Sequence, residues 1–544
     1  MAAAVAIRLF AAEKIKLFLT ISLVLILGTL LSIFYNQRNY GINEEIVEQF
    51  IKSQEELYAL KIHFSQLQDL LLKEKYKTPK PEYEKLRRRI ANTIQEFWSF
   101  INSEINYIKK EKKSDDIIET LDKVISAGVQ YKRSMVLDVE KISQVDGFNE
   151  WRIKEINNLS DIIQDRLSYL QNPVDCENAK KLVCQINYFC GFGCQMHHLI
   201  SCMTLAYGTQ RTLILKSINW QYHKAGWEGV FKSLSKLCTY VNDTIAVTYP
   251  GNKNSLVIDL PPKTQIHPRS KYLPLAIPED LSYRLATVHG NPSAWWIGQI
   301  LKYVWKPQNV TMSHINHKIA QLQLGNSYVA VHIRRTDKIR SEARFQSVEK
   351  YMAKVEEYFN ETLVDTNVAK RKVYIATDDF NAITEAKAKY PHYDIIHNPD
   401  VPNNPRPDFL HSKDNIISVI LDIHIMSHSH YLVCTFSSNI CRLAYELMQI
   451  YHVDASAKIA SLDDIYFYSQ ENTNQRVTIT SHKAQSAQEI DLLPGDIVHI
   501  TYNYWNGYSK GKNLRTRKHG LFPSFKVDMG METVKFPTYS EIYT

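Results

Sequence analysis

The residues best suited to chemistry stand together in segment 328–338, which reads Tyr-Val-Ala-Val-His-Ile-Arg-Arg-Thr-Asp-Lys. Its apolar start predicts a buried strand whose carboxyl end presents His332, Arg334, Arg335, Asp337 and Lys338. Two adjacent guanidinium groups offer forked donors that match phosphate oxygens and keep their charge at neutral pH. A structural ion pair with Asp337 is the alternative. Two arginines beside a histidine at a strand end favour a diphosphate site.

A second anion-binding element is predicted at 434–441, where an apolar strand turns through Ser437 and Ser438 directly into a helix. Free N–H groups at the start of a helix favour an anion. Capping of that helix explains one serine equally well, so the sequence leaves Ser438 open as an N-cap or a diphosphate ligand.

Three aspartates accompany these elements. Asp378 and Asp379 close a strand predicted at 373–377. No second cluster of metal ligands stands near them in the sequence, so we expect them to position arginines and loops, and we predict no metal or cofactor. Asp422 lies in an apolar helical pattern that would bury it. Because a buried carboxylate needs donors, the N1–H and amine of a guanine base would suit it.

The cysteines of 190–194, followed by His197 and His198, have the residue types of a zinc site. All eight cysteines, however, lie within 176–441. An even number confined to the folded part is typical of a disulfide framework in an oxidising compartment. We therefore expect the two cysteines of 190–194 to form a disulfide.

Beyond Pro173, short β-branched runs alternate with helices, which predicts an α/β fold with a doubly wound, Rossmann-type nucleotide-binding sheet. The predicted strands are 212–215, 329–333, 373–376, 393–396 and 431–435. The predicted helices are 346–362, 414–427 and 440–450. Segment 398–409 carries four prolines and is predicted to be a surface loop that faces the substrate.

Residues 17–35 form a run of nineteen residues without a charge. At ~1.5 Å per residue such a run crosses the hydrocarbon layer. Basic residues such as Arg8, Lys14 and Lys16 precede it, which predicts a cytosolic N-terminus and a lumenal remainder. A cleaved signal peptide is the less favoured alternative.

Residues 36–170 are poor in glycine and proline, and apolar residues recur every seven positions from Phe50 to Leu71. A proline-containing break at 78–81 ends this first helix. The segment is predicted to be a coiled-coil stem, either as a spacer or as a dimerising bundle, and we favour a homodimer because apolar seams need a partner. Further helices are predicted at 90–108, 117–142 and 156–170.

The last segment has the order of an SH3-like barrel in its motifs at 491–498, 505–508 and 520–527. The Ala-Leu-Tyr-Asp-Tyr strand that helps to build a peptide groove is missing. We therefore expect a barrel used for packing or acceptor binding, with recognition of proline-rich peptides as the alternative.

The balance of charges argues against a nucleic-acid partner. The net charge is +8, from 65 basic and 57 acidic residues, and the basic residues are spread along the chain. The runs at 85–89 and 109–113 fit solvated faces of helices. At 544 residues the chain must hold several domains.

Together these segments resemble the eukaryotic α1,6-fucosyltransferases that build core fucose on N-glycans, and an invertebrate member in particular. The motifs that carry the resemblance are 331–338, 434–438, 461–466, 505–511 and 534–539. The resemblance implies an inverting, metal-independent enzyme of two-lobed, GT-B-like form in the Golgi membrane. It would transfer fucose from GDP-β-L-fucose to the 6-hydroxyl of the innermost GlcNAc of a glycoprotein N-glycan.

The resemblance also assigns roles to residues. Glu342 would be the catalytic base, with Lys338 as proton relay and Arg334 as a further catalytic residue. Donor-site residues would be His332, Arg334, Arg335, Asp337, Tyr351, Asp378, Asp379, Asp422 and Ser438. Acceptor-site residues would be Lys338, Glu342 and Asp463. The implied disulfides are Cys176–Cys238, Cys184–Cys202, Cys190–Cys194 and Cys434–Cys441.

The departures from vertebrate members lie on the acceptor side, where Tyr188, Thr264 and Tyr504 replace Lys, Asp and His. They leave the acceptor branch preference open. A non-catalytic lumenal glycan-binding scaffold and a protein O-fucosyltransferase remain as alternatives. The expected domains are a cytosolic tail at 1–16, a transmembrane anchor at 17–35, a stem at 36–170, a catalytic domain at 171–470 and an SH3-like domain at 471–544.

Overall fold

The structure is a computed structural model of the 544-residue chain. It describes residues 52, 78–111, 114–187, 190–241, 246–262, 265–325, 327–335, 344–362, 371–400, 413–468 and 474–542. The chain divides into two compact units, 1–78 and 79–544, and every element below lies in the second unit. Within the described ranges, no helix has the length and apolar character needed to cross a membrane. The predicted anchor 17–35 lies outside those ranges.

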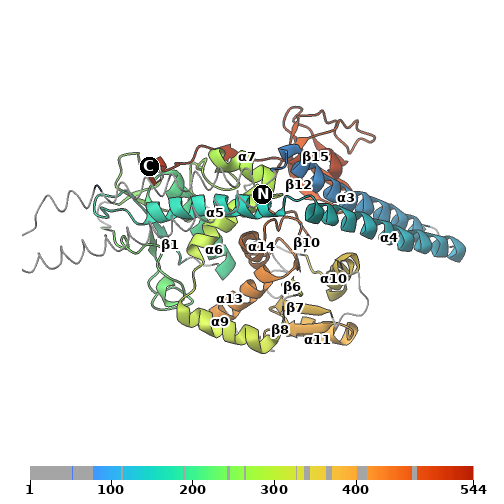
Figure 1. The fold of residues 1–544 in the computed structure, drawn as a ribbon, viewed down its shortest axis with the longest axis horizontal. Coiled ribbons are helices and arrows are strands. Elements are labelled where there is room, and N and C mark those ends of the chain that lie inside the picture. Colours follow the sequence, from blue (N-terminus) through green and yellow to red (C-terminus); the bar gives the residue numbers. More distant parts are fainter. Residues whose placement is uncertain are drawn as a thin grey trace, which may run out of the picture. The chain divides into compact units, whose positions relative to one another are not determined.

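The second unit begins with two long helices, α3 (Pro81–Glu111) and α4 (Asp115–Val145), that run side by side (Figure 1). The proline-containing break predicted at 78–81 marks the start of α3, where Pro81 occupies the first helical position, the position that proline tolerates best. The predicted helices at 90–108 and 117–142 are confirmed as parts of α3 and α4.

Helix α5 (Asn149–Gln171) packs differently from these two helices. Leu159, Ile163 and Leu167 are fully buried in the largest hydrophobic cluster, together with side chains of the α/β domain. This last part of the predicted stem therefore belongs to the core of the globular body.

The basic run at 85–89 is only in part the solvated helix face that we expected. Arg88 donates to the main-chain oxygens of Ala286 at 2.8 Å and Thr287 at 3.0 Å. Arg89 lies 2.8 Å from the Asp528 carboxylate in the C-terminal sheet. The expectation was wrong for Arg88 and Arg89, because their side of α3 turns toward the body of the protein and they find partners there, whereas Lys85 is exposed as expected.

A first parallel sheet has the strand order β2-β1-β4-β3. Its strands are β1 (Lys181–Gln185), β2 (Thr212–Lys216), β3 (Ala246–Thr248) and β4 (Val257–Leu260). The helices of this half of the body are α6 (Phe192–Gly208), α7 (Glu279–Val288), α8 (Pro292–Val304), α9 (Asn309–Leu322) and the 3₁₀ turn η1 (Trp227–Gly229).

A second parallel sheet has the order β10-β9-β6-β7-β8. Its strands are β6 (Val329–Ile333), β7 (Lys372–Thr377), β8 (Asp394–His397), β9 (Tyr431–Cys434) and β10 (Ile459–Ser461). Its helices are α10 (Val348–Thr362), α11 (Phe380–Lys389), α13 (Lys413–His428) and α14 (Asn439–Tyr451). The predicted strands and helices of this region are confirmed to within two residues.

Burial explains why these strands read as continuous apolar runs. Along β6, Val329 and Val331 enter one hydrophobic cluster, whereas Ala330 enters the other. In β7, Ile375 and Tyr374 divide in the same way. Alternate side chains of a strand point to opposite faces, so both faces of the second sheet are covered, as is usual in parallel sheets.

The C-terminal strands form an antiparallel sheet of order β14-β13-β12-β11-β15, which we call the C-terminal barrel. Its elements are β11 (Asn474–Thr478), β12 (Ile497–Asn503), β13 (Tyr508–Asn513), β14 (His519–Pro523), β15 (Val527–Met529) and the 3₁₀ turn η5 (Ser524–Lys526). Four strands meander and β15 pairs back onto β11, which agrees with the predicted SH3-like order. Strand β16 (Thr533–Val534) pairs with β5 (Ile277–Pro278), and the turn η6 (Ser540–Ile542) follows.

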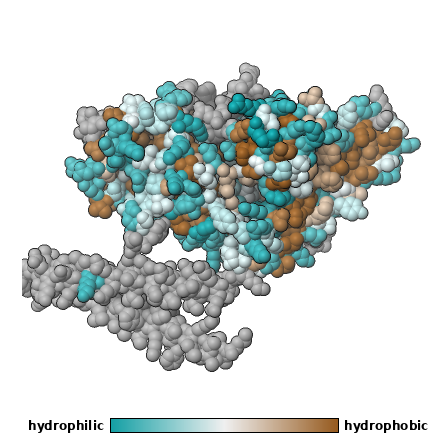
Figure 2. All heavy atoms as spheres, turned by 90° about the horizontal axis from the view of Figure 1, so that it is seen from above, coloured by the Kyte–Doolittle hydropathy of each residue, from teal (hydrophilic) through white to brown (hydrophobic). Residues whose placement is uncertain are grey.

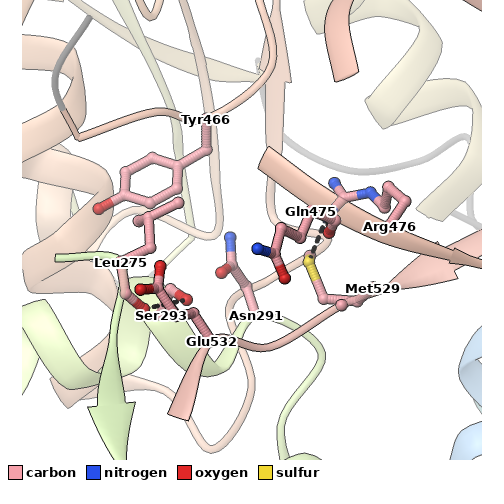
Figure 3. Close-up of a pocket in the computed structure, with 9 residues that line it drawn as sticks. Leu275, Asn291, Ser293, Tyr466, Gln475, Arg476, Met529 and Glu532 are labelled. Carbon is pink, nitrogen blue, oxygen red and sulfur yellow. Dashed lines mark hydrogen bonds between the residues drawn. The ribbon is translucent and has the colours of Figure 1, made fainter. Parts of the chain in front are cut away.

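A small cavity lies where the C-terminal barrel meets the first half of the body. In Figure 3, Asn291 stands between Tyr466 on one side and Gln475 and Arg476 on the other. The cavity volume is about 30 Å³. Since a water site needs ~10–15 Å³ and a drug-sized ligand ~300 Å³ or more, this cavity suits one or two waters, not a sugar nucleotide.

Candidate active site

The carboxyl ends of four neighbouring parallel strands form one edge of the second sheet. Strands β10, β9, β6 and β7 end at Ser461, Cys434, Ile333 and Thr377. The residues that follow these strand ends include most of the predicted site residues that the structure describes. Open α/β sheets bind their ligands at this edge.

The two arginines after β6 are held by the two aspartates after β7. Arg334 Nη1 lies 2.8 Å from Asp378 Oδ2, and the main-chain N–H of Arg335 donates to Asp378 Oδ1 at 2.9 Å. Arg335 Nη1 lies 3.3 Å from Asp379 Oδ2 and 3.5 Å from Glu385 Oε2. The aspartates thus position the arginines, as the sequence analysis expected, and each arginine acts as an oriented set of N–H donors whose charge is largely compensated.

His332 is buried in β6 beside the same aspartate. Burial lowers the pKa of His332 to about 4, while the Asp378 charge raises it and the Arg334 charge lowers it further. His332 is therefore neutral near pH 7 and can offer a hydrogen bond but no charge. Its Nδ1 atom is buried without a hydrogen-bond partner among the described residues.

The turn from β9 into α14 lies next to β6. The Cys434–Cys441 disulfide closes it, and Ser438 is the N-cap of α14, without a side-chain capping bond to any described residue. Ser437 Oγ is buried and, like Arg335 Nε, has no hydrogen-bond partner in the part of the chain that the structure describes. The turn therefore presents a helix start and a hydroxyl group to the sheet edge, an arrangement suited to an anion.

Asp463, after β10, contacts this turn directly. Its Oδ1 accepts from the N–H of Phe436 at 2.8 Å, and its Oδ2 accepts from the N–H of Ser437 at 3.3 Å. Ser461 Oγ donates to the same carboxylate at 3.0 Å. The side chain that the family resemblance places in the acceptor site thus also holds the turn after β9.

Tyr351 of α10 is buried close to these groups. Burial raises the pKa of its hydroxyl, a hydrogen bond with Thr435 lowers it, and the charges of Asp463 and Arg335 have smaller effects of opposite sign. Tyr351 is therefore neutral and borders the same turn.

Asp422 of α13 lies beside β7 at a different place. The Tyr374 hydroxyl donates to Asp422 Oδ1 at 2.5 Å. Burial raises the pKa of Asp422 to about 7, while hydrogen bonds from Tyr374 and Asn398 lower it. Asp422 is thus held by side chains of β7 and of the segment that follows β8.

Several predicted residues lie outside the described part of the chain. These are Asp337, Lys338, Glu342, Tyr188 and Thr264. Tyr504 is described and lies exposed on the C-terminal barrel, with its ring centroid 4.8 Å from that of Tyr502.

The structure contains disulfides between the four cysteine pairs that the resemblance implies. In the zinc-like segment, His197 Nε2 lies 3.0 Å from Glu446, and His198 Nε2 lies 3.5 Å from the sulfurs of both Cys184 and Cys202. Because both cysteines are in a disulfide, no thiolate is available there for a metal. The disulfide interpretation of the zinc-like segment is confirmed.

Sequence reasoning missed some contributors to the site. Glu385 was not considered, although it lies near Arg335, and Phe345 stacks under the Arg335 guanidinium at 4.8 Å. Asp463 and Tyr351 were found only through the resemblance. The patterns around these four residues are those of ordinary helices and loops, so no local signal marks them.

The chain is thus a parallel α/β protein that gathers arginines, aspartates and serines at one edge of its second sheet. Residues 29–467 match the family described as "Alpha-(1,6)-fucosyltransferase N- and catalytic domains". The alpha-(1,6)-fucosyltransferase of Drosophila melanogaster is 44% identical over 468 residues, which are 85% of this chain and 76% of that protein. The Caenorhabditis elegans alpha-(1,6)-fucosyltransferase is 34% identical over 445 residues, 79% of each protein.

Two solved structures show more distant likenesses. Fucosyltransferase NodZ from Bradyrhizobium covers 49% of this chain and 92% of its own, at 13% identity and a TM-score of 0.33. The SH3 domain of yeast NBP2 covers 11% of this chain and 98% of its own, at 28% identity and a TM-score of 0.10.

The family match and the two relatives show that the chain belongs to the alpha-(1,6)-fucosyltransferase family and is a fucosyltransferase. The predicted family resemblance is confirmed. The alternatives of a non-catalytic scaffold and a protein O-fucosyltransferase are not favoured.

Proposed function

We propose that the protein transfers L-fucose from GDP-β-L-fucose to the 6-hydroxyl of the innermost, Asn-linked GlcNAc of N-glycans. One observation carries the proposal of a donor diphosphate at the second sheet. His332 Nδ1, Arg335 Nε and Ser437 Oγ are buried at neighbouring strand ends, and none has a partner among the described residues. Because buried polar atoms are normally hydrogen-bonded, such a set fits a polar ligand.

The proposed reaction is a single inverting displacement. As the 6-hydroxyl oxygen bonds to the anomeric carbon of fucose, the bond to the diphosphate oxygen breaks and its electrons leave with GDP. Glu342 accepts the hydroxyl proton, and Lys338 stabilises the resulting charge or relays the proton. N–H groups of Arg334 and Arg335 and the turn at Ser438 stabilise the negative charge that develops on the diphosphate.

Asp422 would accept hydrogen bonds from the N1–H and the amine of the guanine base. Asp337 would contribute to the diphosphate site. We propose that the enzyme needs no metal. The two arginines and the helix start supply donors at the place where a metal would otherwise bind the diphosphate.

The finer architecture follows the same proposal. The two parallel sheets at 171–470 would form the two lobes of a GT-B-like catalytic domain, with the SH3-like domain at 471–544 beside it. Residues 17–35 would anchor the protein in the Golgi membrane as a type II protein, with a cytosolic tail at 1–16 and a lumenal catalytic domain.

We also propose a homodimer through the stem. Large apolar side chains gather on α3 and α4, among them Phe97, Tyr107, Tyr131 and Val145, which are 57–74% exposed. Figure 2 shows hydrophobic residues grouped at the right-hand end, where Figure 1 places these helices. Apolar patches of this kind mark interaction surfaces, and a second copy would cover them.

The function is tested by incubating the full-length protein with GDP-fucose and a defined N-glycan, with and without EDTA. Mass spectrometry of the product is expected to locate one fucose on the innermost GlcNAc, in equal yield with EDTA. Glycans with and without a terminal GlcNAc on the α1,3 arm would define the acceptor preference that Tyr188, Thr264 and Tyr504 leave open. No transfer by the wild-type protein would refute the proposal.

Two variants separate binding from chemistry. Arg334→Ala is expected to abolish transfer and weaken GDP binding, because it removes diphosphate contacts and leaves Asp378 without its ion pair. Glu342→Gln should bind GDP as the wild type does and lose transfer. Wild-type transfer by either variant would contradict its assigned role.

A further inference from the structure

The C-terminal barrel contacts segment 463–465, a short stretch of chain that follows the last strand of the second sheet. Ile465 packs against the barrel's hydrophobic cluster, which includes Val498 and Phe522. Trp505, in the turn between β12 and β13, donates its indole Nε1–H to the main-chain oxygen of Asp463 at 3.1 Å. Segment 463–465 is thus held by the barrel at both of its ends.

The same segment carries the carboxylate that organises the turn after β9. Asp463 accepts from the N–H groups of Phe436 and Ser437, at 2.8 and 3.3 Å. These bonds set the path of the chain just before Ser438 and the start of α14. A hydrogen bond weakens steeply with misalignment, so a shift of the Asp463 main chain alters the turn.

The main chain at Trp505 is itself held in place. Its main-chain N–H donates to Asn503 Oδ1 at 2.8 Å, and its φ angle is +54°, a left-handed conformation uncommon for a bulky residue. Such conformations persist where surrounding contacts enforce them, often near functional sites. The main-chain position of Trp505 is thus defined, and from it the indole N–H reaches the main-chain oxygen of Asp463.

We propose that Trp505 is a positioning residue for the donor site, through which the C-terminal barrel sets the geometry of the turn at 435–438 by way of Asp463. This role rests on the proposed binding of GDP-fucose at that turn. It gives the barrel a function in donor binding that is separate from any contact with the acceptor glycan. A direct acceptor contact by the half-exposed indole is the competing explanation, and the two predict different kinetic changes.

The test compares full-length Trp505→Phe, which keeps an aromatic ring but loses the N–H, with Tyr502→Phe as a matched control. Tyr502 is an exposed aromatic residue of the same barrel that has no contact with Asp463 among the described residues. Three quantities are measured: the Kd for GDP by calorimetry, the KM values for GDP-fucose and for the glycan, and hydrogen exchange of the Phe436 and Ser437 amides.

For Trp505→Phe we expect the Kd for GDP and the KM for GDP-fucose to rise about threefold, as suits one half-exposed hydrogen bond. Exchange of the two amides should quicken about threefold with the melting temperature unchanged, and any rise in the glycan KM should not exceed the rise in the GDP-fucose KM, since Asp463 also belongs to the expected acceptor site. Tyr502→Phe should change none of these. Adding Trp505→Phe to Asp463→Asn should have less effect than in the wild type, because the two residues act on one turn.

Unchanged amide exchange and unchanged GDP affinity in Trp505→Phe would overturn the inference. A raised glycan KM with normal donor values would show that Trp505 contacts the acceptor instead, and full additivity with Asp463→Asn would also contradict the proposed route. If the wild-type protein bound no GDP, the proposed function would fail, whereas the amide exchange would still decide whether Trp505 controls the turn.

Discussion

The two parallel sheets have the same kind of strand connection but differ at their carboxyl edges. At the first sheet, Ser217 Oγ accepts from the N–H of Trp227 at 3.0 Å, and Asn187 Nδ2 donates to the oxygen of Ile218 at 3.0 Å. Both side chains bond to the protein's own loops, whereas Asp259 Oδ1, within β4 itself, is buried without a partner among the described residues. The first half of the body also contains three of the four disulfides.

At the second sheet, polar atoms after the strands remain without partners among the described residues, as His332 Nδ1 and Ser437 Oγ do. The comparison teaches that a parallel α/β sheet does not by itself make a nucleotide site. The residues that follow each strand decide whether the polar groups at a sheet edge bond to the protein's own loops or stay available for a ligand.

The largest expected effect concerns the stability of the first sheet. Replacing Cys176 and Cys238 by serine opens a crosslink across 62 residues, and chain entropy gives a loss of about 4 kcal/mol in the free energy of unfolding. Replacing Cys434 and Cys441, separated by 7 residues, should cost about 2 kcal/mol and also weaken GDP binding. Chemical denaturation and calorimetry check both. If the two variants bound GDP with equal affinity, the proposal that only the second sheet binds GDP would be contradicted.

Arg335→Lys should weaken GDP binding about thirtyfold, because lysine keeps a charge but cannot reproduce the planar fork or the Nε–H. The matched control is Arg211→Lys, just before β2 of the first sheet, where the guanidinium donates to the oxygens of Ser255 and Asn252. That variant should lose stability and keep its GDP affinity. Titration calorimetry of both proteins distinguishes the two roles, and a normal Kd for Arg335→Lys would count against the diphosphate site.

Binding of GDP-fucose should depend on pH through Asp422. Burial raises the pKa of this carboxyl to about 7, so the ionised form that accepts from guanine grows as pH rises through 7. If only that form binds, the apparent Kd should be about tenfold higher at pH 6 than at pH 8. GDP-fucose is the proper probe because its esterified diphosphate does not titrate in this range. Asp422→Asn should bind GDP-fucose weakly and with little pH dependence. A pH profile in this variant like that of the wild type would exclude the role of the ionised Asp422 carboxylate in binding.

The smallest expected effect comes from a matched pair of serines. Ser217→Ala should lower the free energy of unfolding by about 1 kcal/mol, because it leaves the N–H of Trp227 without its acceptor, and GDP affinity should not change. Ser437→Ala should leave the stability of the unliganded protein within about 0.5 kcal/mol and weaken GDP binding about fivefold. The same effect on stability from both variants would contradict the contrast drawn between the two edges.

Much of the second sheet could be predicted from the sequence. Its strands are buried on both faces, so each reads as a continuous apolar run, and the turn signals between them are clear. In the first sheet only β2 was predicted. Strand β1 carries Lys181 and Gln185 at its ends, and β3 has three residues, so neither has a strong pattern of its own. Helix α5 looked like stem because a helical repeat does not reveal which surface it packs against.

The types of residues that end the strands can be recognised from the sequence alone: the arginine pair at 334–335, the aspartate pair at 378–379 and the serines at 437–438. These are local signals, since a buried strand followed by polar residues can be recognised within about ten positions. The sequence also determined the family, through motifs that occur in order along the chain.

The tertiary structure alone decided which of these ends meet. Strand β6 lies between β7 and β9, so arginines near 334 and serines near 437 become neighbours although about a hundred residues separate them. Only the packed structure shows that Asp463 holds the serine turn and that Trp505 reaches Asp463 from the C-terminal barrel. The physical reason is that hydrophobic periodicity specifies which face of an element is buried, whereas the order of strands and the meeting of loops depend on packing between distant segments.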